Sequence, residues 1–168
     1  EELVRARDAG KIGRIGVGAE SVTSAGEASR HEDIGVVQLP FGILDTEALS
    51  VFRDDSTDRT PSFWARGVLG GGVLAAAMTG TSMLDHYPKR GLVLELQEIA
   101  EDAAIQVDEL ALRWVAGHPE ITSTMVGISS PDHLHRNIDL AARGPLDSEV
   151  AAAVAAAHQR HRGVMEES

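Results

Sequence analysis

The sequence predicts an α/β fold in which four parallel strands alternate with helices. Short runs rich in Ile, Val and Leu recur along the chain, and the run at 34–39 is apolar on both faces, as a buried parallel strand should be. The segments between these runs are typical of helices. Strands that are separated by helices pair in parallel through right-handed crossovers. With 168 residues, 43% of them hydrophobic, we expect one domain over 1–168.

The first half of the chain is expected to begin with a helix over residues 1–9 and a strand over 15–17. A helix over 21–30 leads to the second strand, at 34–39. A short helix over 46–52 and a solvated loop over 53–61, with an acidic run at 54–58, precede the third strand. That third strand is expected over 62–66.

The second half is dominated by helices. A long helix over 89–104 has a single apolar stripe of Leu92, Leu96, Ile99 and Ala103. The next helix ends at His118-Pro119, and it carries Leu110, Ala111, Trp114 and Val115. The fourth strand is expected over 123–126. Ser130, Pro131 and Asp132 then form a helix start, and the buried face of that helix is predicted to be Leu134, Ile138 and Ala141. Asp147 is expected to cap a last, Ala-rich helix.

Composition excludes several classes of partner. A net charge of −11 argues against nucleic acid and against anionic membranes. The chain has no Cys, which excludes disulfides and thiolate metal sites. It has no apolar run near the roughly 18 residues of a membrane span and no signal-peptide pattern at its start. We therefore expect a cytoplasmic protein that binds neither nucleic acid nor membrane.

Several segments resemble the aldo-keto reductase family, in the family's usual order. They are AGKIGRIGVG at 9–18, VVQLPF at 36–41, ARGVLGGG at 65–72, LALRWV at 110–115 and VGISSPDHL at 126–134 with Asn137. The resemblance covers nearly the whole chain. It implies strands five to eight of the family's barrel, that is, half of a (β/α)8 TIM barrel of four parallel strands with surrounding helices. Ligand residues would then lie at the C-terminal ends of the strands.

The resemblance also implies a binding site for NADP(H). Gln38 stands where the family binds the nicotinamide amide. The segment after the third strand would lie beside the nicotinamide and the pyrophosphate, through Arg66, Gly67, Leu69 and Gly72. The last strand's loop and helix would hold the 2′-phosphate and the adenine, through Gly127, Ser129, Ser130, His133 and Asn137.

The last of these sites also has a reason of its own. A helix that begins at Ser130 presents free N–H groups and the positive end of its dipole to an anion. Ser129, His133 and Asn137 recur every four residues and so lie close to one face of that helix. Many family members have Arg where Ser129 stands, so the sequence does not distinguish NAD from NADP.

Two departures from the family bear on activity. Gly18-Ala19 replaces a Ser-Asn pair that binds the nicotinamide. The family's catalytic Asp, Tyr, Lys and His lie on its first four strands, before the position of residue 1, and none of them can be assigned here. The resemblance therefore implies the cofactor-side half of a reductase of aldehydes or ketones, inactive by itself.

Two other clusters invite a functional interpretation. The segment from Asp85 to Lys89 contains all four tetrad residue types, but neighbours in a loop cannot converge as a tetrad does, which favours a polar loop. The His158/His161 and His133/His135 pairs lack further ligands at a suitable spacing. They are expected to be solvated helix residues rather than a metal site.

Half a barrel leaves two strand edges and one sheet face uncovered. Exposing roughly eight inward side chains would cost about 10–20 kcal/mol, comparable to the whole stability of a domain. We therefore expect the chain to pair with a missing N-terminal half, to pair with a second copy of itself, or to repack. Three functions remain open: half of a reductase, a self-associating binding or scaffold module without a tetrad, and a half-barrel recruited to other chemistry.

Overall fold

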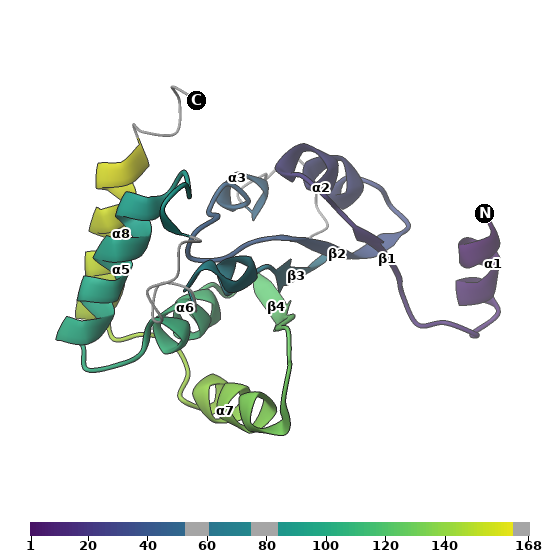
Figure 1. Cartoon of the computed structure of the whole chain (residues 1–168). Coiled ribbons are helices and arrows are strands. Elements are labelled where there is room, and N and C mark those ends of the chain that lie inside the picture. The colour runs from purple at the N-terminus through teal and green to yellow at the C-terminus, as the bar shows by residue number, and fades with distance from the viewer. Residues whose placement is uncertain (53–60, 75–83, 163–168) are drawn as a thin grey trace.

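The computed structural model describes residues 1–52, 61–74 and 84–162 of the chain. Its single sheet has four parallel strands in the order β1-β2-β3-β4 (Figure 1). The strands are β1 (Ile15–Gly18), β2 (Ile34–Pro40), β3 (Ser62–Arg66) and β4 (Ile121–Thr124). The predicted parallel α/β fold is thus confirmed, and its sequential strand order is that of neighbouring strands in a (β/α)8 barrel. The loop expected over 53–61 lies outside the described residues except for Pro61, which is buried.

Helices separate the strands as the sequence predicts. They are α1 (Glu2–Asp8), α2 (Val22–Ser29), α3 (Leu49–Phe52), a 3-10 turn η1 (Gly70–Gly72), α5 (Arg90–Asp102), α6 (Val107–Ala116), α7 (Pro131–Ala142) and α8 (Ser148–His161). The expectation for α3 was too long, because residues 46–48 form hydrogen-bonded turns instead. The expectation for β4 was two residues late, because the turn at His118 closes directly onto Ile121, whose N–H donates to the His118 carbonyl at 3.0 Å.

The two faces of the sheet differ in burial. Val37, Leu39, Phe63 and Ala65 alternate along β2 and β3 and are at most 2% exposed. The opposite face is half-buried or exposed, and Trp64 on it is 37% exposed. We call this second face the open face; by strand register it comprises Gly16, Gly18, Val36, Gln38, Pro40, Ser62, Trp64, Arg66 and Ser123. It is the face that was expected to line a closed barrel.

The core lies between the buried face of the sheet and the helices. Phe41, just past the end of β2, is 1% exposed and packs its ring against Trp114 of α6 and Phe52 of α3. On α5 the expected stripe is present, with Leu92 and Leu96 buried and the other two members half-buried. Every described helix from α2 onward, except η1, contributes a buried side chain, so the sheet is covered on one face by a continuous core.

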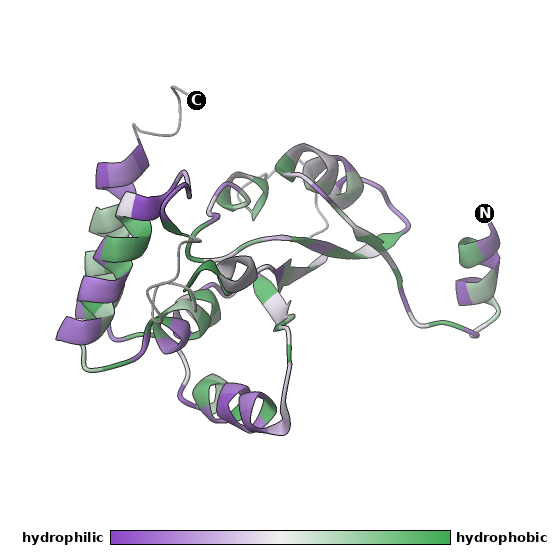
Figure 2. Ribbon diagram, in the orientation of Figure 1, coloured by the Kyte–Doolittle hydropathy of each residue, from purple (hydrophilic) through white to green (hydrophobic). Residues whose placement is uncertain are grey.

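The prediction for the buried face of α7 was wrong. Leu134 and Ile138 are 40% and 56% exposed, Ala141 is exposed, and Leu140 is the buried residue of the helix. In Figure 2, hydrophobic residues are visible on α7 although the helix lies away from the sheet. Leu140 follows Ile138 by two positions, which at about 100° per residue turns it by about 200°. The helix therefore packs through the face opposite to the one expected.

Candidate functional site

Gln38 links the carboxyl ends of the first and last strands. It lies on the open face, paired in register with Gly18 of β1 and Trp64 of β3. Its side-chain Nε2 donates to the Met125 sulfur just past β4, at 2.7 Å. A Cβ at Gly18 would lie 3.4 Å from Gln38 Oε1, so the missing side chain at Gly18 leaves the amide oxygen uncovered on that side. The residue that the resemblance marks for a nicotinamide amide is thus held at the centre of the sheet's end.

Arg66 ties the end of β3 to the loop after β1. Its Nη2 donates to the Ala19 carbonyl at 3.0 Å, and the Ala19 N–H donates to the Gln38 carbonyl at 2.7 Å. Ala19 is 1% exposed, so this link is covered. Part of the guanidinium therefore holds three strand ends in place, a contact that no pattern in the sequence indicates because its acceptor is a backbone carbonyl 47 residues away.

The segment after Arg66 needs glycine for backbone reasons. Gly67, Gly71 and Gly72 have φ of +74°, +61° and +99°, in the region that L side chains avoid. All three are exposed, and a Cβ at any of them would meet no atom within 4 Å. Leu69, between them, is half-buried against the core. The result is a bare backbone surface next to the strand ends, which a phosphate group could approach closely.

The start of α7 has the predicted arrangement. Ser130 is the N-cap, and its Oγ accepts from the His133 N–H at 3.2 Å. The Ser129 hydroxyl is hydrogen-bonded to His133 Nδ1 at 2.8 Å. Gly127, Ser129 and His133 are exposed, and Asn137 is half-buried. Hydroxyl, imidazole and free helix N–H groups therefore share one exposed end of the helix, which suits an anion.

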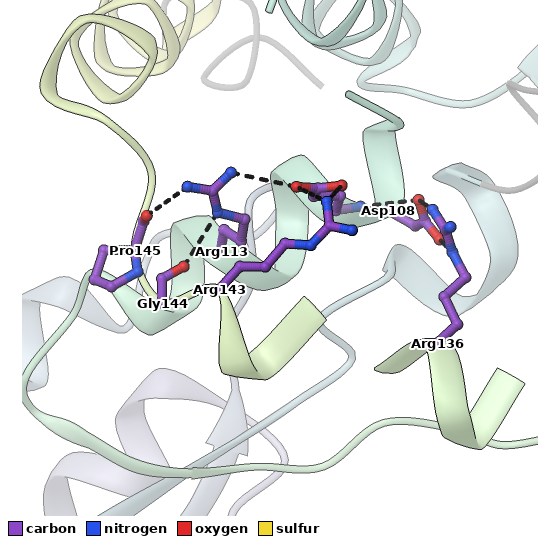
Figure 3. A network of polar contacts seen from close by, with 7 residues as sticks. Asp108, Arg113, Arg136, Arg143, Gly144 and Pro145 are labelled. Atoms are coloured by element: carbon purple, nitrogen blue, oxygen red, sulfur yellow. Dashed lines mark hydrogen bonds and ion pairs between the residues drawn. The ribbon is translucent and has the colours of Figure 1, made fainter. Parts of the chain in front are cut away.

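Charged side chains attach α7 to α6 (Figure 3). Glu109 of α6 is 5% exposed, and its carboxylate accepts from Arg143 at 2.9 and 3.0 Å and from Arg113 at 3.2 Å. Arg113 also donates to the carbonyls of Gly144 and Pro145, beyond the end of α7. Two turns earlier on α7, Arg136 makes two 2.8 Å bonds to Asp108.

This network explains the orientation of α7. Arg136, Leu140 and Arg143 recur at i, i+4 and i+7, so they form one face of the helix, and that face meets α6. The apolar residues of the sequence do not indicate this packing face, because two of its three members are arginines. The signal that could have revealed it is the acidic pair at the start of α6 matched by two arginines seven residues apart.

The predicted cofactor residues fall into two groups. One gathers at the ends of β1, β2 and β3 and includes Gln38, Arg66 and the glycine segment. The other lies at the start of α7. The Gln38–Met125 contact joins the first group to the connection that leads into α7. Within the described residues, no hydrogen bond joins the glycine segment to α7.

The segment from Asp85 to Lys89 is a polar loop before α5, as predicted. Asp85 and His86 are exposed. Burial raises the pKa of Tyr87, and the charge of Asp45 raises it further. A general acid that works near neutral pH needs the opposite shift, toward a lower pKa. Lys89 donates to the Leu44 carbonyl at 2.6 Å. No described hydrogen bond or ion pair joins these side chains to one another.

The expectation of solvated histidines was wrong for α8. His158 is half-buried and its Nε2 donates to the Ile43 carbonyl at 2.7 Å, while His161 binds Glu95 at 2.8 Å. In the parts of the chain that are described, no three His, Cys, Asp or Glu side chains are grouped as metal ligands would be. No described helix has the length and hydropathy of a membrane span.

Comparison with known proteins gives this arrangement a context. The family model for the aldo/keto reductase family matches residues 1–159. A curated relative, pyridoxal 4-dehydrogenase of Microbacterium luteolum, is 22% identical over 142 residues. That match covers 81% of this chain and 42% of the relative, so the chain spans less than half of the relative's length. Because the family match takes in all four strands and all but the last two residues of α8, the chain belongs to the aldo/keto reductase family.

Proposed function

We propose that the chain is the C-terminal, cofactor-side half of an NAD(P)H-dependent aldo/keto reductase that acts on an aldehyde or ketone. The observation that carries the proposal is the placement of Gln38, the glycine segment and the capped start of α7 after three strands of one parallel sheet. The similarity to a pyridoxal 4-dehydrogenase supports a carbonyl compound as substrate class.

The residues present fit a dinucleotide. Gln38 offers an amide beside the space that Gly18 leaves open, which suits a carboxamide. The exposed glycines at 67, 71 and 72 offer backbone N–H groups to a pyrophosphate, and Ser129, Ser130 and His133 offer a phosphate site. When bound, the dinucleotide would supply the hydride; the chain's own residues bind and orient it. The family's catalytic tetrad belongs to the strands that this half would face.

Titration of NADP⁺ by calorimetry tests the proposal. The double variant Ser129→Asp with Asn137→Ala puts a negative charge where a phosphate would lie and removes the adenine contact. We expect it to weaken NADP⁺ binding by about tenfold or more, equivalent to about 1.4 kcal/mol. His135→Ala, an exposed change on the same helix, is the control and should bind as the parent does. Equal affinity of the parent and the double variant would place the site elsewhere.

A carbonyl reduction assay with NADPH and a panel of aldehydes is the companion measurement. We expect no turnover by the chain alone, because general acid catalysis contributes about 10²–10⁴-fold and Tyr87 is not placed for it. Turnover that is lost on Tyr87→Phe would overturn the interpretation of the loop at 85–89.

A second function, a self-associating binding module, is favoured by one specific observation. Trp64 on the open face and Ile128 and Ile138 near α7 are exposed apolar side chains. A partner that covers them could be a second copy of the chain as well as the first half of a barrel. Homodimers are the commonest oligomers, and a homodimer would cover these side chains without the first half of a barrel.

A further inference from the structure

A separate pocket lies on the helical side of the molecule. It is bounded by the connection after β2, the start of α5 and the end of α8, and its volume is about 290 Å³. Its floor is apolar, formed by Ile43, Leu44 and Leu92, which are at most 5% exposed. None of its lining residues is among the proposed cofactor-binding residues.

The charge of this pocket is opposite to that of the chain. Lys89, His158, His161 and Arg162 line it, and none of the described residues that line it is a carboxylate, although the chain as a whole carries a net charge of −11. Such a local field attracts anions.

Two of these groups, Lys89 and Arg162, have no carboxylate partner among the described residues. Lys89 and His158 donate to the backbone carbonyls of Leu44 and Ile43, which are uncharged acceptors. Glu95 binds His161 from outside the lining, and its carboxylate is shared with Arg160. Burial most of all, and then the charges of Arg162, His118 and Lys89, hold the pKa of His158 below its ordinary value against the raising effect of the carbonyl. The positive charge of the pocket near neutral pH therefore comes mainly from Lys89 and Arg162.

We propose that this pocket binds a small amphipathic organic anion. Its carboxylate or phosphate head would lie against Lys89 and Arg162, where charge-assisted hydrogen bonds are stronger than neutral ones. Its apolar body would lie on Leu44 and Leu92. The volume of about 290 Å³ lies just below the usual range of about 300–1,000 Å³ for ligand pockets, so a short acyl chain or a single aromatic ring fits the space.

The pocket is also in contact with the candidate pyrophosphate segment. A Cβ at Gly70 would lie 2.7 Å from Leu44 Cδ1, so Leu44 packs directly beneath the turn that begins η1. An occupant resting on Leu44 would therefore lie behind this segment, on the other side from the open face. The binding experiment does not depend on the proposed dinucleotide site, because no dinucleotide is added.

Calorimetric titration with octanoate, octanamide and inorganic phosphate tests the proposal. We expect octanoate to bind, and the neutral amide and the phosphate, which lacks the apolar body, each to bind at least about tenfold more weakly. In the Arg162→Met variant octanoate should also bind at least about tenfold more weakly; Arg162 is exposed, so the fold should be retained. Lys11→Met, an exposed change outside the lining that removes the same unit of charge, should keep the parent affinity within about twofold.

Histidine ring signals in NMR spectra locate the binding. Octanoate should shift the ring resonances of His158 and His161 and leave that of the exposed His31 unchanged. The proposal is overturned if octanamide binds as tightly as octanoate, if phosphate alone matches octanoate, or if no binding is detected. It also fails if the shifts appear at Trp64 on the open face instead of at α8. Octyl phosphate binding more tightly than octanoate, with the same His158 and His161 shifts, would identify the head group as a phosphate.

Discussion

Glu109 shows what a single buried charge does in this molecule. Its carboxylate is 5% exposed and accepts from both Arg113 and Arg143. Removing one partner of a buried ion pair strands the other charges, at a cost of about 3–5 kcal/mol. We expect Glu109→Gln to lower the free energy of unfolding by about 3 kcal/mol, the low end, because Arg143 is 56% exposed.

Urea denaturation measures this loss, with Asp108→Asn as the matched control. Asp108 is the preceding residue and has its own arginine, but Arg136 is 43% exposed, so the control should lose about 1 kcal/mol or less. Equal losses in the free energy of unfolding would show that the burial of Glu109 adds nothing to the cost of removing its charge.

His158 should make stability depend on pH. Burial holds its pKa below the ordinary 6.5, so the folded chain binds the proton less tightly than the unfolded chain does. The contribution of His158 to stability is therefore complete above pH 6.5, and it is lost as the pH falls toward the folded pKa. We expect His158→Gln, which can still donate to the Ile43 carbonyl, to flatten this decline. Thermal unfolding across this pH range measures it, and His86→Gln, at an exposed site, should leave the decline as steep as in the parent.

At the scale of elements, the end of α5 holds a residue in a costly conformation. Ala104 has φ +54°, and the N–H groups of Ala104 and Ile105 donate to the carbonyls of Glu101 and Ala100, each at 2.9 Å. This is a Schellman ending, in which glycine is the usual left-handed residue. We expect Ala104→Gly to raise the free energy of unfolding by about 0.5–1 kcal/mol, since it removes the clash of Cβ with the backbone.

Chemical denaturation tests this, with Ala103→Gly as the control. Ala103 has φ −81°, which suits alanine, so glycine there should destabilise the chain by about 0.5 kcal/mol. A gain at position 103, or a loss at position 104, would contradict the interpretation of the helix end.

At the scale of the whole molecule, the exposed apolar side chains set the expected behaviour in solution. Trp64 and Val17 are each 37% exposed on the sheet, and β1 and β4 are its edges. Uncovered edges pair with other strands, and uncovered apolar faces associate. We expect light scattering at micromolar concentration to show species larger than a monomer. Trp64→Arg should reduce association, whereas Leu3→Arg, exposed on α1, should not.

A monomer that binds no hydrophobic dye would contradict this expectation. It would mean that the open face is covered in solution, and the placement of Gln38 and Arg66 at the mouth of a barrel would have to be abandoned. If the parent associates and Trp64→Arg associates equally, the contact lies away from the open face, for example at Ile138 on α7.

Local signals in the sequence determined the order and type of the elements. Strands apolar on both faces predicted β2, and the Ser130-Pro131-Asp132 sequence predicted the start of α7. The family resemblance singled out Gln38, and its place on the open face agrees with strand alternation. These features depend on residues a few positions apart, so the sequence carries them directly.

Tertiary structure alone decided how those elements face one another. On α7, Leu134, Ile138 and Ala141 have the same helical spacing as Arg136, Leu140 and Arg143, so periodicity permits either face to pack. The carboxylate of Glu109 on a neighbouring helix selected the second face. Likewise, the Arg66 contact with the Ala19 carbonyl and the burial of His158 against Ile43 join residues 47 and 115 positions apart. Such partners are brought together only when the chain folds, because backbone acceptors leave no trace in the residue pattern.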